Sequence, residues 1–419
     1  MKCFVVHQNY PGQFKFLSPA LATDGHQIIA TRLVNAKGHD AGLGSTKSLG
    51  GVEVHRYATS RSSTLKAHPW VLDFETKVIR GQALFDKAKE LRSHGFNPDL
   101  IVAHPGWGEA LFLQHVWPKA KLAIFCEWFY GAQGLDVGFD PEFGPPSDNT
   151  LCRLTVKNLS CLSAMQWASG GLAPTHWQAN TYPADFRKKM VVVHDGIDTQ
   201  TIRPADQDLP WPDFLAKAGV PPSVPLVTFI NRNLEPYRGY HSFMRALPQM
   251  LAGDPQLHVA MVGGEDKGYG AAAPQGKTWR QVYEAEVFGK LTSQQEARVH
   301  YLGKLPHDQL VRLYQTSTVH VYLTYPFVLS WSVLEAMSAG CAVVASGTGP
   351  VEEVIQDGDN GVLVDFFNPS ALVEKVLTLV ADPQQRKRLG QNARQTIVER
   401  YDLKTVCLPK QIEWISSLV

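Results

Sequence analysis

The sequence has no excess of charge of either sign, and this excludes a broad class of partners. Its 419 residues include 40 Lys and Arg and 39 Asp and Glu, which gives a formal net charge of +1. Proteins that bind nucleic acid through its phosphates usually carry a basic excess. We therefore expect no nucleic-acid partner. Repeats and low-complexity segments are also absent, and 44% of the residues are apolar, which is typical of a globular protein.

Long hydrophobic runs are missing as well. No run approaches the roughly 18 continuous apolar residues that a membrane-spanning helix needs. The opening MKCFVVHQN turns polar too soon for a secretory signal peptide. We expect a soluble, cytoplasmic protein, and peripheral contact with the inner face of a membrane stays open.

Cysteine and glycine signatures of two other classes are absent. The 6 cysteines show neither C-x-x-C spacing nor a histidine at zinc-ligand distance, so we expect reduced thiols of a cytosolic protein. No G-x-G-x-x-G follows the first predicted strand, which argues against a dinucleotide-dependent oxidoreductase.

Short apolar runs alternate with helical patterns along the chain. This alternation predicts an α/β protein with parallel, doubly wound sheets. The first series of predicted strands covers 3–6, 27–30, 52–57, 100–103, 122–125, 170–173 and 190–193. The second covers 226–230, 258–262, 299–302, 319–323, 341–345 and 361–364. The clearest helices are expected at 70–94, 240–252, 370–381, 384–400 and 403–418, the last kinked at Pro409.

Chain length and a proline-rich stretch divide the chain into domains. A chain of 419 residues fits two domains of roughly 200 residues each. Residues 199–225 hold six prolines without a long apolar period, and at least their first half is predicted to be a linker. We place Rossmann-like domains at 1–203 and 204–400, followed by a C-terminal helix at 401–419.

The stretch 318–349 carries the strongest functional signal. It predicts a buried strand, a short turn, a helix capped by Ser330 or Ser332, and a second buried strand. A helix that begins at the carboxyl end of a parallel strand favours an anion such as phosphate. Glu335 lies one turn into this helix, where a phosphate would repel it. A sugar diol is one partner for this carboxylate, and ordinary solvation is an equally supported alternative.

A second signal follows the first strand of the second domain. Arg232 and Arg238 lie six residues apart on a loop fixed by proline and glycine, and forked guanidinium groups match the oxygens of a diphosphate. Surface ion pairing is the competing interpretation. Gly263 follows the next strand and permits a close approach to the backbone.

Polar residues also follow strands of the first domain, where they are candidates for the acceptor side of a site. A histidine at a strand end can donate to a sugar hydroxyl or carry a proton at neutral pH, although a packed loop histidine is a serious alternative. The acceptor-side candidates are Tyr10, Gln13, Trp107, Glu109 and Glu127, whereas His104 is a candidate catalytic residue and Gly12 is a candidate on the donor side.

Together these features resemble the family 4 glycosyltransferases of the GT-B fold. The most specific stretches are 327–346, GPVEEVIQDGDNGVLV at 349–364 and DGIDTQTIRP at 195–204. The resemblance implies two Rossmann-like domains facing across a cleft, with the last helix returning to the first domain. It also implies a metal-independent enzyme without a cofactor. Such an enzyme moves a sugar from a nucleotide diphosphate donor to an acceptor hydroxyl with retention of the anomeric configuration.

The resemblance also implies roles for donor-side residues. Glu335 matches the acid that holds the donor ribose, and Glu353 matches the acid of the family's P-E segment. The backbone of Leu329, Ser330 and Trp331 would face the phosphates and the donor sugar.

Four further positions follow from the same resemblance. Arg232 and Arg238 would neutralise the departing diphosphate, His104 would touch the transferred sugar, and Gly12 would lie on a loop that closes over the phosphates.

The chain departs from the family pattern at three points. Phe327 stands where the first acid of the E-x7-E motif belongs, Asn231 replaces a glycine, and the basic loop has one extra residue with Arg238 in place of lysine. Phe327 motivates an alternative, a catalytically silent nucleotide-sugar binder that regulates another transferase. An epimerase or phosphorylase is a weaker alternative. The nucleotide, the sugar and the acceptor, whether a carbohydrate, a lipid-linked sugar or a small molecule, are not encoded in any pattern that we can interpret.

Overall fold

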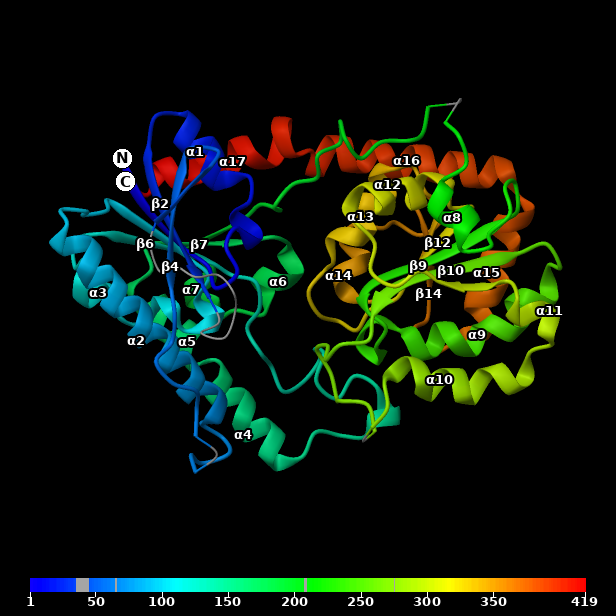
Figure 1. Ribbon diagram of the computed structural model, residues 1–419, viewed down its shortest axis with the longest axis horizontal. Coiled ribbons are helices and arrows are strands. Elements are labelled where there is room, and N and C mark those ends of the chain that lie inside the picture. Colours follow the sequence, from blue (N-terminus) through cyan, green and yellow to red (C-terminus); the bar gives the residue numbers. More distant parts are fainter. Residues whose placement is uncertain (35–44, 65, 207–208, 275) are drawn as a thin grey trace. The chain divides into compact units, whose positions relative to one another are not determined.

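The structure, a computed structural model, describes residues 1–34, 45–64, 66–206, 209–274 and 276–419. Its contacts divide the chain into one unit of Met1–Gly196 with Lys404–Val419 and a second unit of Ile197–Leu403. Figure 1 shows both as sheets flanked by helices. The division at Gly196 lies close to the boundary placed at residue 203 from the sequence.

The first unit is built on an eight-stranded sheet with the strand order β3-β4-β2-β1-β5-β6-β7-β8. Every neighbouring pair is parallel except β3 with β4. The strands are β1 (Lys2–Val6), β2 (Gln27–Leu33), β3 (Ser45–Leu49), β4 (Val52–Tyr57), β5 (Leu100–Ala103), β6 (Lys121–Phe125), β7 (Gly170–Ala173) and β8 (Met190–Val192). All of the predicted strands in this half are confirmed.

Strand β3 was not predicted. It falls between the strands predicted at 27–30 and 52–57, where the sequence analysis places no element, and it directly follows residues 35–44, which lie outside the described residues. The strand sequence STKSL has a single apolar residue, so no hydrophobic alternation marks it. An antiparallel edge strand of this kind depends on backbone pairing, here with β4.

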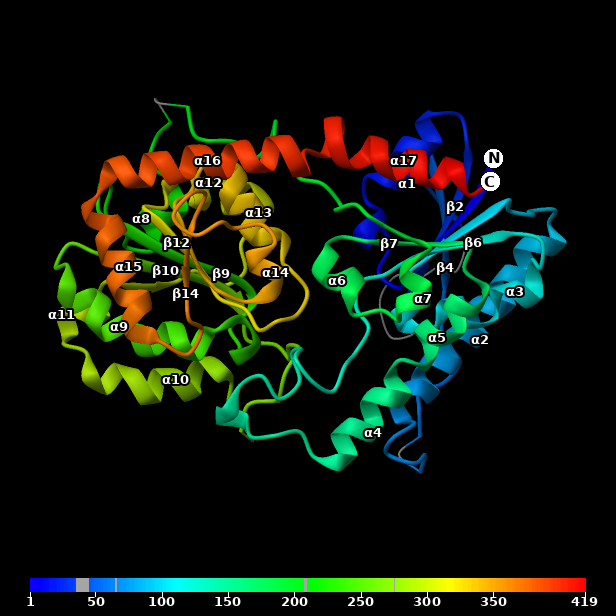
Figure 2. The ribbon, with the colours of Figure 1, turned by 180° about the vertical axis from the view of Figure 1, so that it is seen from behind.

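Helices cover both faces of the first sheet. One core contains residues of α2 (Leu72–Ser93), α3 (Leu113–Val116) and α5 (Leu159–Trp167). The other contains residues of α1 (Leu17–Thr23) and α17 (Leu408–Ser417), which lie on the opposite face (Figure 2). The remaining helices of this unit are α4 (Asp148–Lys157), α6 (His176–Asn180) and α7 (Ala184–Arg187).

The second unit is built on a six-stranded parallel sheet with the order β11-β10-β9-β12-β13-β14. All of the predicted strands are confirmed here too. They are β9 (Leu226–Asn233), β10 (His258–Gly264), β11 (Val299–Tyr301), β12 (Val319–Tyr322), β13 (Val343–Ser346) and β14 (Val362–Val364).

Two groups of helices enclose the second sheet. Helix α9 (Tyr240–Gly253) packs against α10 (Trp279–Val287) and α15 (Pro369–Ala381). Helix α13 (Trp331–Ser338) packs against α12 (His307–Thr316) and α16 (Pro383–Tyr401) on the other face (Figure 1). The short helices are α8 (Asp213–Lys217), α11 (Ser293–Glu296) and α14 (Gly349–Glu352).

The end of the chain differs from the prediction. A π-helical turn, Leu403–Cys407, follows α16, and Pro409 lies in the first turn of α17. The helix predicted at 403–418 is confirmed apart from this π-helical first turn, which ends two residues before Pro409, and the kink at Pro409 stays a prediction. Proline is accommodated in a first helical turn, where its missing N–H would have no intrahelical acceptor. Among the described residues, no helix has the length and apolarity needed to cross a membrane.

We predict that Trp414→Ala destabilises the first unit by about 3–5 kcal/mol, the usual cost of removing a buried tryptophan. Trp414 is 7% exposed in the core formed with α1, whereas Trp167, 52% exposed on α5, supplies the control Trp167→Ala. Denaturant unfolding measures both variants. Equal stability of the two variants would contradict the docking of α17 on this unit.

Candidate functional site

Arg238 ties together two segments of the second unit. Its buried guanidinium Nη1 donates to Thr324 Oγ1 at 2.8 Å, to the Val328 carbonyl at 3.2 Å and to Tyr322 Oη at 3.4 Å. These acceptors lie at the end of β12 or in the connection from β12 to α13. The loop of residues 231–239, the arginine loop, is thereby fastened to the chain that leads into α13.

The entrance of α13 is capped by Ser330. Its Oγ accepts the Ser332 amide at 3.3 Å, and its own amide donates to Tyr322 Oη at 3.1 Å. Tyr322 Oη therefore lies between this amide and the Arg238 guanidinium. The positive end of the helix dipole and a guanidinium meet at one sheet edge, which favours an anion.

Arg232 presents a second cation. It lies near the end of β9 and is exposed, and its guanidinium has no hydrogen-bond or ion-pair partner within the part of the chain that the structure describes. Asn231 and Asn233, its neighbours in the strand, are buried. The strand thus fixes the backbone of Arg232 and leaves its side chain to solvent.

Between the two arginines lies a residue that the sequence analysis missed. Glu235 is 3% exposed, and its Oε2 accepts the amide of Tyr269 at 2.8 Å. Burial raises the pKa of Glu235, opposed by the hydrogen bond from Tyr269 and the charge of Arg238. The only sequence signal is a carboxylate flanked by two arginines in a loop.

The described residues of 265–278, namely 265–274 and 276–278, form the glycine-rich segment, which is held against the arginine loop at Glu235. Gly268 makes this possible, because a Cβ at this position would overlap the Glu235 carboxylate. At the other end of the segment, Thr278 Oγ1 donates to Glu265 Oε2 at 2.6 Å. The segment is therefore anchored at its ends and near its middle.

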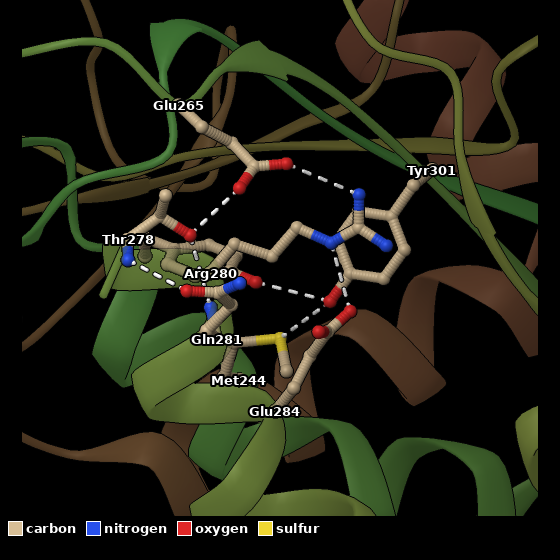
Figure 3. Close-up of polar contacts among 8 residues, drawn as sticks. Met244, Glu265, Thr278, Arg280, Gln281, Glu284 and Tyr301 are labelled. Atoms are coloured by element: carbon tan, nitrogen blue, oxygen red, sulfur yellow. Dashed lines mark hydrogen bonds and ion pairs between the residues drawn. The ribbon is translucent and has the colours of Figure 1, made fainter. Parts of the chain in front are cut away.

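Figure 3 shows the network that anchors the end of this segment. The Arg280 guanidinium donates to Glu265 at 3.3 Å and to Glu284 at 2.8 Å, and it lies 3.8 Å from the centroid of the Tyr301 ring. Tyr301 in turn shares a 3.0 Å hydrogen bond with Tyr240 of α9. These contacts join β11, α9 and α10, and they hold Glu265 and Thr278 at the two ends of the glycine-rich segment.

Phe327 replaces the family's first acid for a packing reason. It is 5% exposed, and its ring centroid lies 5.7 Å from that of Tyr237 and 5.2 Å from that of Tyr269. The Tyr269 ring is itself 5.4 Å from the Arg238 Cζ. A carboxylate at position 327 would be buried among aromatic rings, where a charge is costly. Phe327 instead joins the arginine loop, the glycine-rich segment and the entrance of α13.

The remaining residues predicted to bind the donor differ in how deeply they are buried. Glu335 lies in α13, and its Oε1 is 2.9 Å from Nε2 of the exposed His307. Leu329 is buried in the core, so only its backbone can face a ligand, whereas Trp331 is exposed.

Two further donor-side positions lie on neighbouring strands and helices. The Gly263 amide donates to the Gly303 carbonyl at 2.9 Å, and a Cβ at Gly263 would press on Leu234 of the arginine loop. Glu353 directly follows α14. Among the described residues, its side chain is not one of the groups that accept a hydrogen bond from Arg238.

In the first unit, polar groups gather at the carboxyl ends of β1, β5 and β6. Glu127 follows β6, and its carboxylate accepts from His104 Nε2 at 3.2 Å and from Gln13 Nε2 at 2.8 Å. His104 follows β5, and its Nδ1 accepts the Gly106 amide at 3.2 Å. Sequence analysis proposed these residues separately, and the structure joins Gln13, His104 and Glu127.

Aromatic rings hold His104 in place. Trp107 stacks on one side, with centroids 5.6 Å apart, and Phe125 contacts it at 5.9 Å. The His7 ring meets it edge-on at 5.6 Å. Gly12, with φ +47°, lies so close to the His7 ring that a Cβ would overlap it. A glycine at position 12 therefore leaves the space that the His7 ring occupies.

Two acceptor-side candidates do not reach the surface. Glu109 is 1% exposed and accepts a hydrogen bond from Tyr57 Oη at 2.9 Å, and burial raises the pKa of Glu109. Tyr10 is buried in the core beneath β1. Both side chains are buried inside the first unit, where a bound acceptor could not contact them.

Two family profiles match the chain. The one described as "Glycosyl transferase family 4 group" matches residues 25–202, and the one described as "Glycosyl transferases group 1" matches residues 213–396. The chain belongs to the family 4 glycosyltransferases. The matched residues lie in both sheets and include the arginine loop, α13 and the His104–Glu127 group.

Curated relatives of this glycosyltransferase match about half of it. D-inositol 3-phosphate glycosyltransferase of Corynebacterium efficiens is 28% identical over 214 residues, covering 51% of this chain and 47% of the relative. Alpha-maltose-1-phosphate synthase of Mycolicibacterium smegmatis is 32% identical over 230 residues, covering 53% and 55%. The chain thus spans about half the length of the curated relatives it matches.

Solved structures share the fold of this glycosyltransferase over its whole length. Sucrose-phosphate synthase from Thermosynechococcus elongatus superposes with a TM-score of 0.74 at 16% identity, covering 100% of this chain and 99% of the other. HepE from Anabaena, in complex with UDP and glucose, gives 0.67 at 19% identity and covers 100% of both. At these identities the likeness shows the GT-B fold.

We predict that Gly268→Ala releases the glycine-rich segment. The added Cβ must displace the Glu235 carboxylate, which breaks its hydrogen bond to the Tyr269 amide. Hydrogen exchange of peptides spanning 265–274 should rise by about tenfold or more, as expected for a lost hydrogen bond to a charged group. Gly289→Ala is the matched control, because no atom lies within 4 Å of its added Cβ. Equal exchange in both variants would show that Glu235 does not hold the segment.

Proposed function

We propose that the protein is a retaining glycosyltransferase that moves a hexose from a nucleotide diphosphate sugar to an acceptor hydroxyl. The observation that supports this most is the contact of Arg238 with the chain entering α13. It gathers Arg238, Arg232 and a helix N-terminus at one edge of the second sheet. Family membership supports the same reaction class.

In the proposed reaction the bond between the anomeric carbon and the phosphate oxygen breaks, and a bond from the acceptor oxygen to that carbon forms. Negative charge builds on the departing diphosphate, where Arg232, Arg238 and the helix N-terminus stabilise it. The acceptor attacks an oxocarbenium-like sugar from the face that the nucleotide leaves. Because the attack comes from that face, no covalent intermediate and no carboxylate nucleophile of the glycosidase kind is required. The acceptor proton passes to the leaving phosphate oxygen, which serves as the base.

The donor contacts are proposed from the family resemblance. Glu335 holds the ribose diol, and the backbone at 329–331 faces the phosphates and the sugar. Gly12, Gly263 and Glu353 border the same donor. HepE was solved in complex with UDP-glucose, which makes UDP-glucose the first donor to test here. The acceptor is a carbohydrate, a lipid-linked sugar or a small molecule, and no metal or other cofactor is proposed.

Silent binding of a nucleotide sugar is less well supported than transfer. Phe327 motivates that alternative, but Phe327 completes an aromatic cluster while both arginines and Glu335 are retained. Thermal shift and turnover across UDP, GDP, ADP and TDP sugars separate the two. Binding without hydrolysis or transfer, with a broad set of acceptors offered, would establish the binder.

We predict that Arg232→Ala lowers turnover about 10²- to 10³-fold, the usual effect of removing one group that stabilises transition-state charge. Its exposed side chain has no partner among the described residues, so the free energy of unfolding should change by less than about 0.5 kcal/mol. Arg388→Ala, which removes another exposed arginine on α16, should leave turnover unchanged. Wild-type turnover in the Arg232 variant would refute the role.

We also predict that Glu335→Ala weakens nucleoside diphosphate binding about 10- to 100-fold, because a ribose diol loses hydrogen bonds to a carboxylate. Inorganic pyrophosphate has no ribose, so its affinity should not fall. Calorimetric titration of wild type and variant with both ligands measures this difference. Equal weakening for the two ligands would argue against a ribose contact.

A further inference from the structure

The carboxylate of Glu127 is positioned from several directions. Its backbone carbonyl accepts from Gln178 Nε2 at 2.8 Å, and the Gln178 side chain is fully buried. Its Oε1 accepts from Gln13, which lies in the turn after β1, and its Oε2 accepts from His104, which follows β5. Three segments far apart in sequence thus converge on Glu127, two of them on its carboxylate and one on its backbone carbonyl.

Backbone hydrogen bonds define the state of the two histidines. His104 Nδ1 accepts from the Gly106 amide and His7 Nδ1 accepts from the Asn9 amide, so each ring is neutral with its proton on Nε2. Burial and the nearby His104 lower the pKa of His7 to about 4, which keeps it neutral. The His104 Nε2–H points at Glu127. Both nitrogens of His104 are therefore engaged, and neither is left for a sugar hydroxyl.

Glu127 itself has unused hydrogen-bonding capacity. Each carboxylate oxygen can accept two hydrogen bonds, and each takes one from the residues that the structure describes. The side chain is 28% exposed, whereas that of His104 is only 5% exposed. Burial tends to raise the pKa of Glu127, but the hydrogen bonds from His104 and Gln13 outweigh this effect and the pKa lies below its ordinary range. The result is an oriented anion that solvent, or a ligand, can reach.

We propose that Glu127 accepts a hydrogen bond from a hydroxyl group of a substrate sugar, and that His104 and Gln13 are positioning residues that orient its carboxylate. This inference deepens the proposed function and rests on it. The hydroxyl belongs either to the transferred hexose or to the acceptor, since both present the same chemistry. His104 then acts through Glu127, which differs from the direct sugar contact that the family resemblance implies.

The first experiment compares Glu127→Gln with wild type, using UDP-glucose and then the other panel sugars as donors. The glutamine amide keeps the shape of the side chain, but its NH2 group faces an N–H group of His104 or Gln13 and can no longer accept a hydrogen bond. Transfer should therefore fall about 10- to 100-fold. The thermal shift given by UDP alone should not change, because Glu127 meets the sugar and not the nucleotide. Glu90→Gln, an exposed glutamate on α2, is the matched control.

The kinetics identify which sugar carries the hydroxyl. Loss of transfer with intact donor hydrolysis in the absence of acceptor assigns it to the acceptor, and loss of both assigns it to the transferred hexose. Wild-type transfer by Glu127→Gln, or a lost UDP shift in that variant, would overturn the proposal.

A second variant tests the positioning role. His104→Phe keeps the stack between Trp107 and Phe125 and removes the hydrogen bond to Glu127. It should lower transfer in the wild-type background and cause no further loss in the Glu127→Gln background. Additive losses would mean that His104 contacts the sugar itself, which would overturn its role as a positioning residue.

Binding of simple sugars tests Glu127 even if no donor is turned over. Saturation-transfer NMR with glucose, mannose, galactose and myo-inositol should give a signal for wild type that Glu127→Gln abolishes and Glu90→Gln retains. Signal equal in all three proteins, or no signal with any sugar, would overturn the proposal independently of the assay for transfer.

Discussion

The structure of the second unit depends on a buried guanidinium that lacks a carboxylate partner. Arg238 donates to a hydroxyl, a phenol and a carbonyl, and among the described residues no carboxylate accepts a hydrogen bond from it. A buried charge normally has a counter-charge, and leaving it uncompensated is costly. Glu235 lowers that cost from nearby, but its own Oε2 is used by the Tyr269 amide. The diphosphate proposed above would supply the missing negative charge beside Arg238.

The same contact explains why the chain tolerates the loss of the family's first acid. Tyr237 and Tyr269 line Arg238 with aromatic rings, and Phe327 packs on both of them. Phe327 is buried at this position, where the resemblance to the family implies an acid. Phe327, Tyr237 and Tyr269 thus form an aromatic cluster beside Arg238 within the second unit.

Much of the fold was predictable from the sequence. Buried parallel strands appear as short apolar runs, and the helices between them show apolar residues at helical spacing. Strand β3 escaped because its sequence STKSL has a single apolar residue and therefore no hydrophobic pattern. The elements that carry the candidate site were predictable where their sequence is contiguous, as in the arginine loop and α13, and the roles of their residues stay predictions. Glu235 was missed because its burial depends on residues 268–270, some thirty positions later in the chain. Glu109 was misplaced because Tyr57, from another strand, draws it inward.

The most direct test of the central claim is a crystal structure of the full chain with the nucleoside diphosphate that gives the largest thermal shift. The account predicts that diphosphate oxygens lie within hydrogen-bond distance of both the Arg232 and the Arg238 guanidinium groups, beside the first turn of α13. A diphosphate bound elsewhere, with both guanidinium groups free of it, would contradict the account.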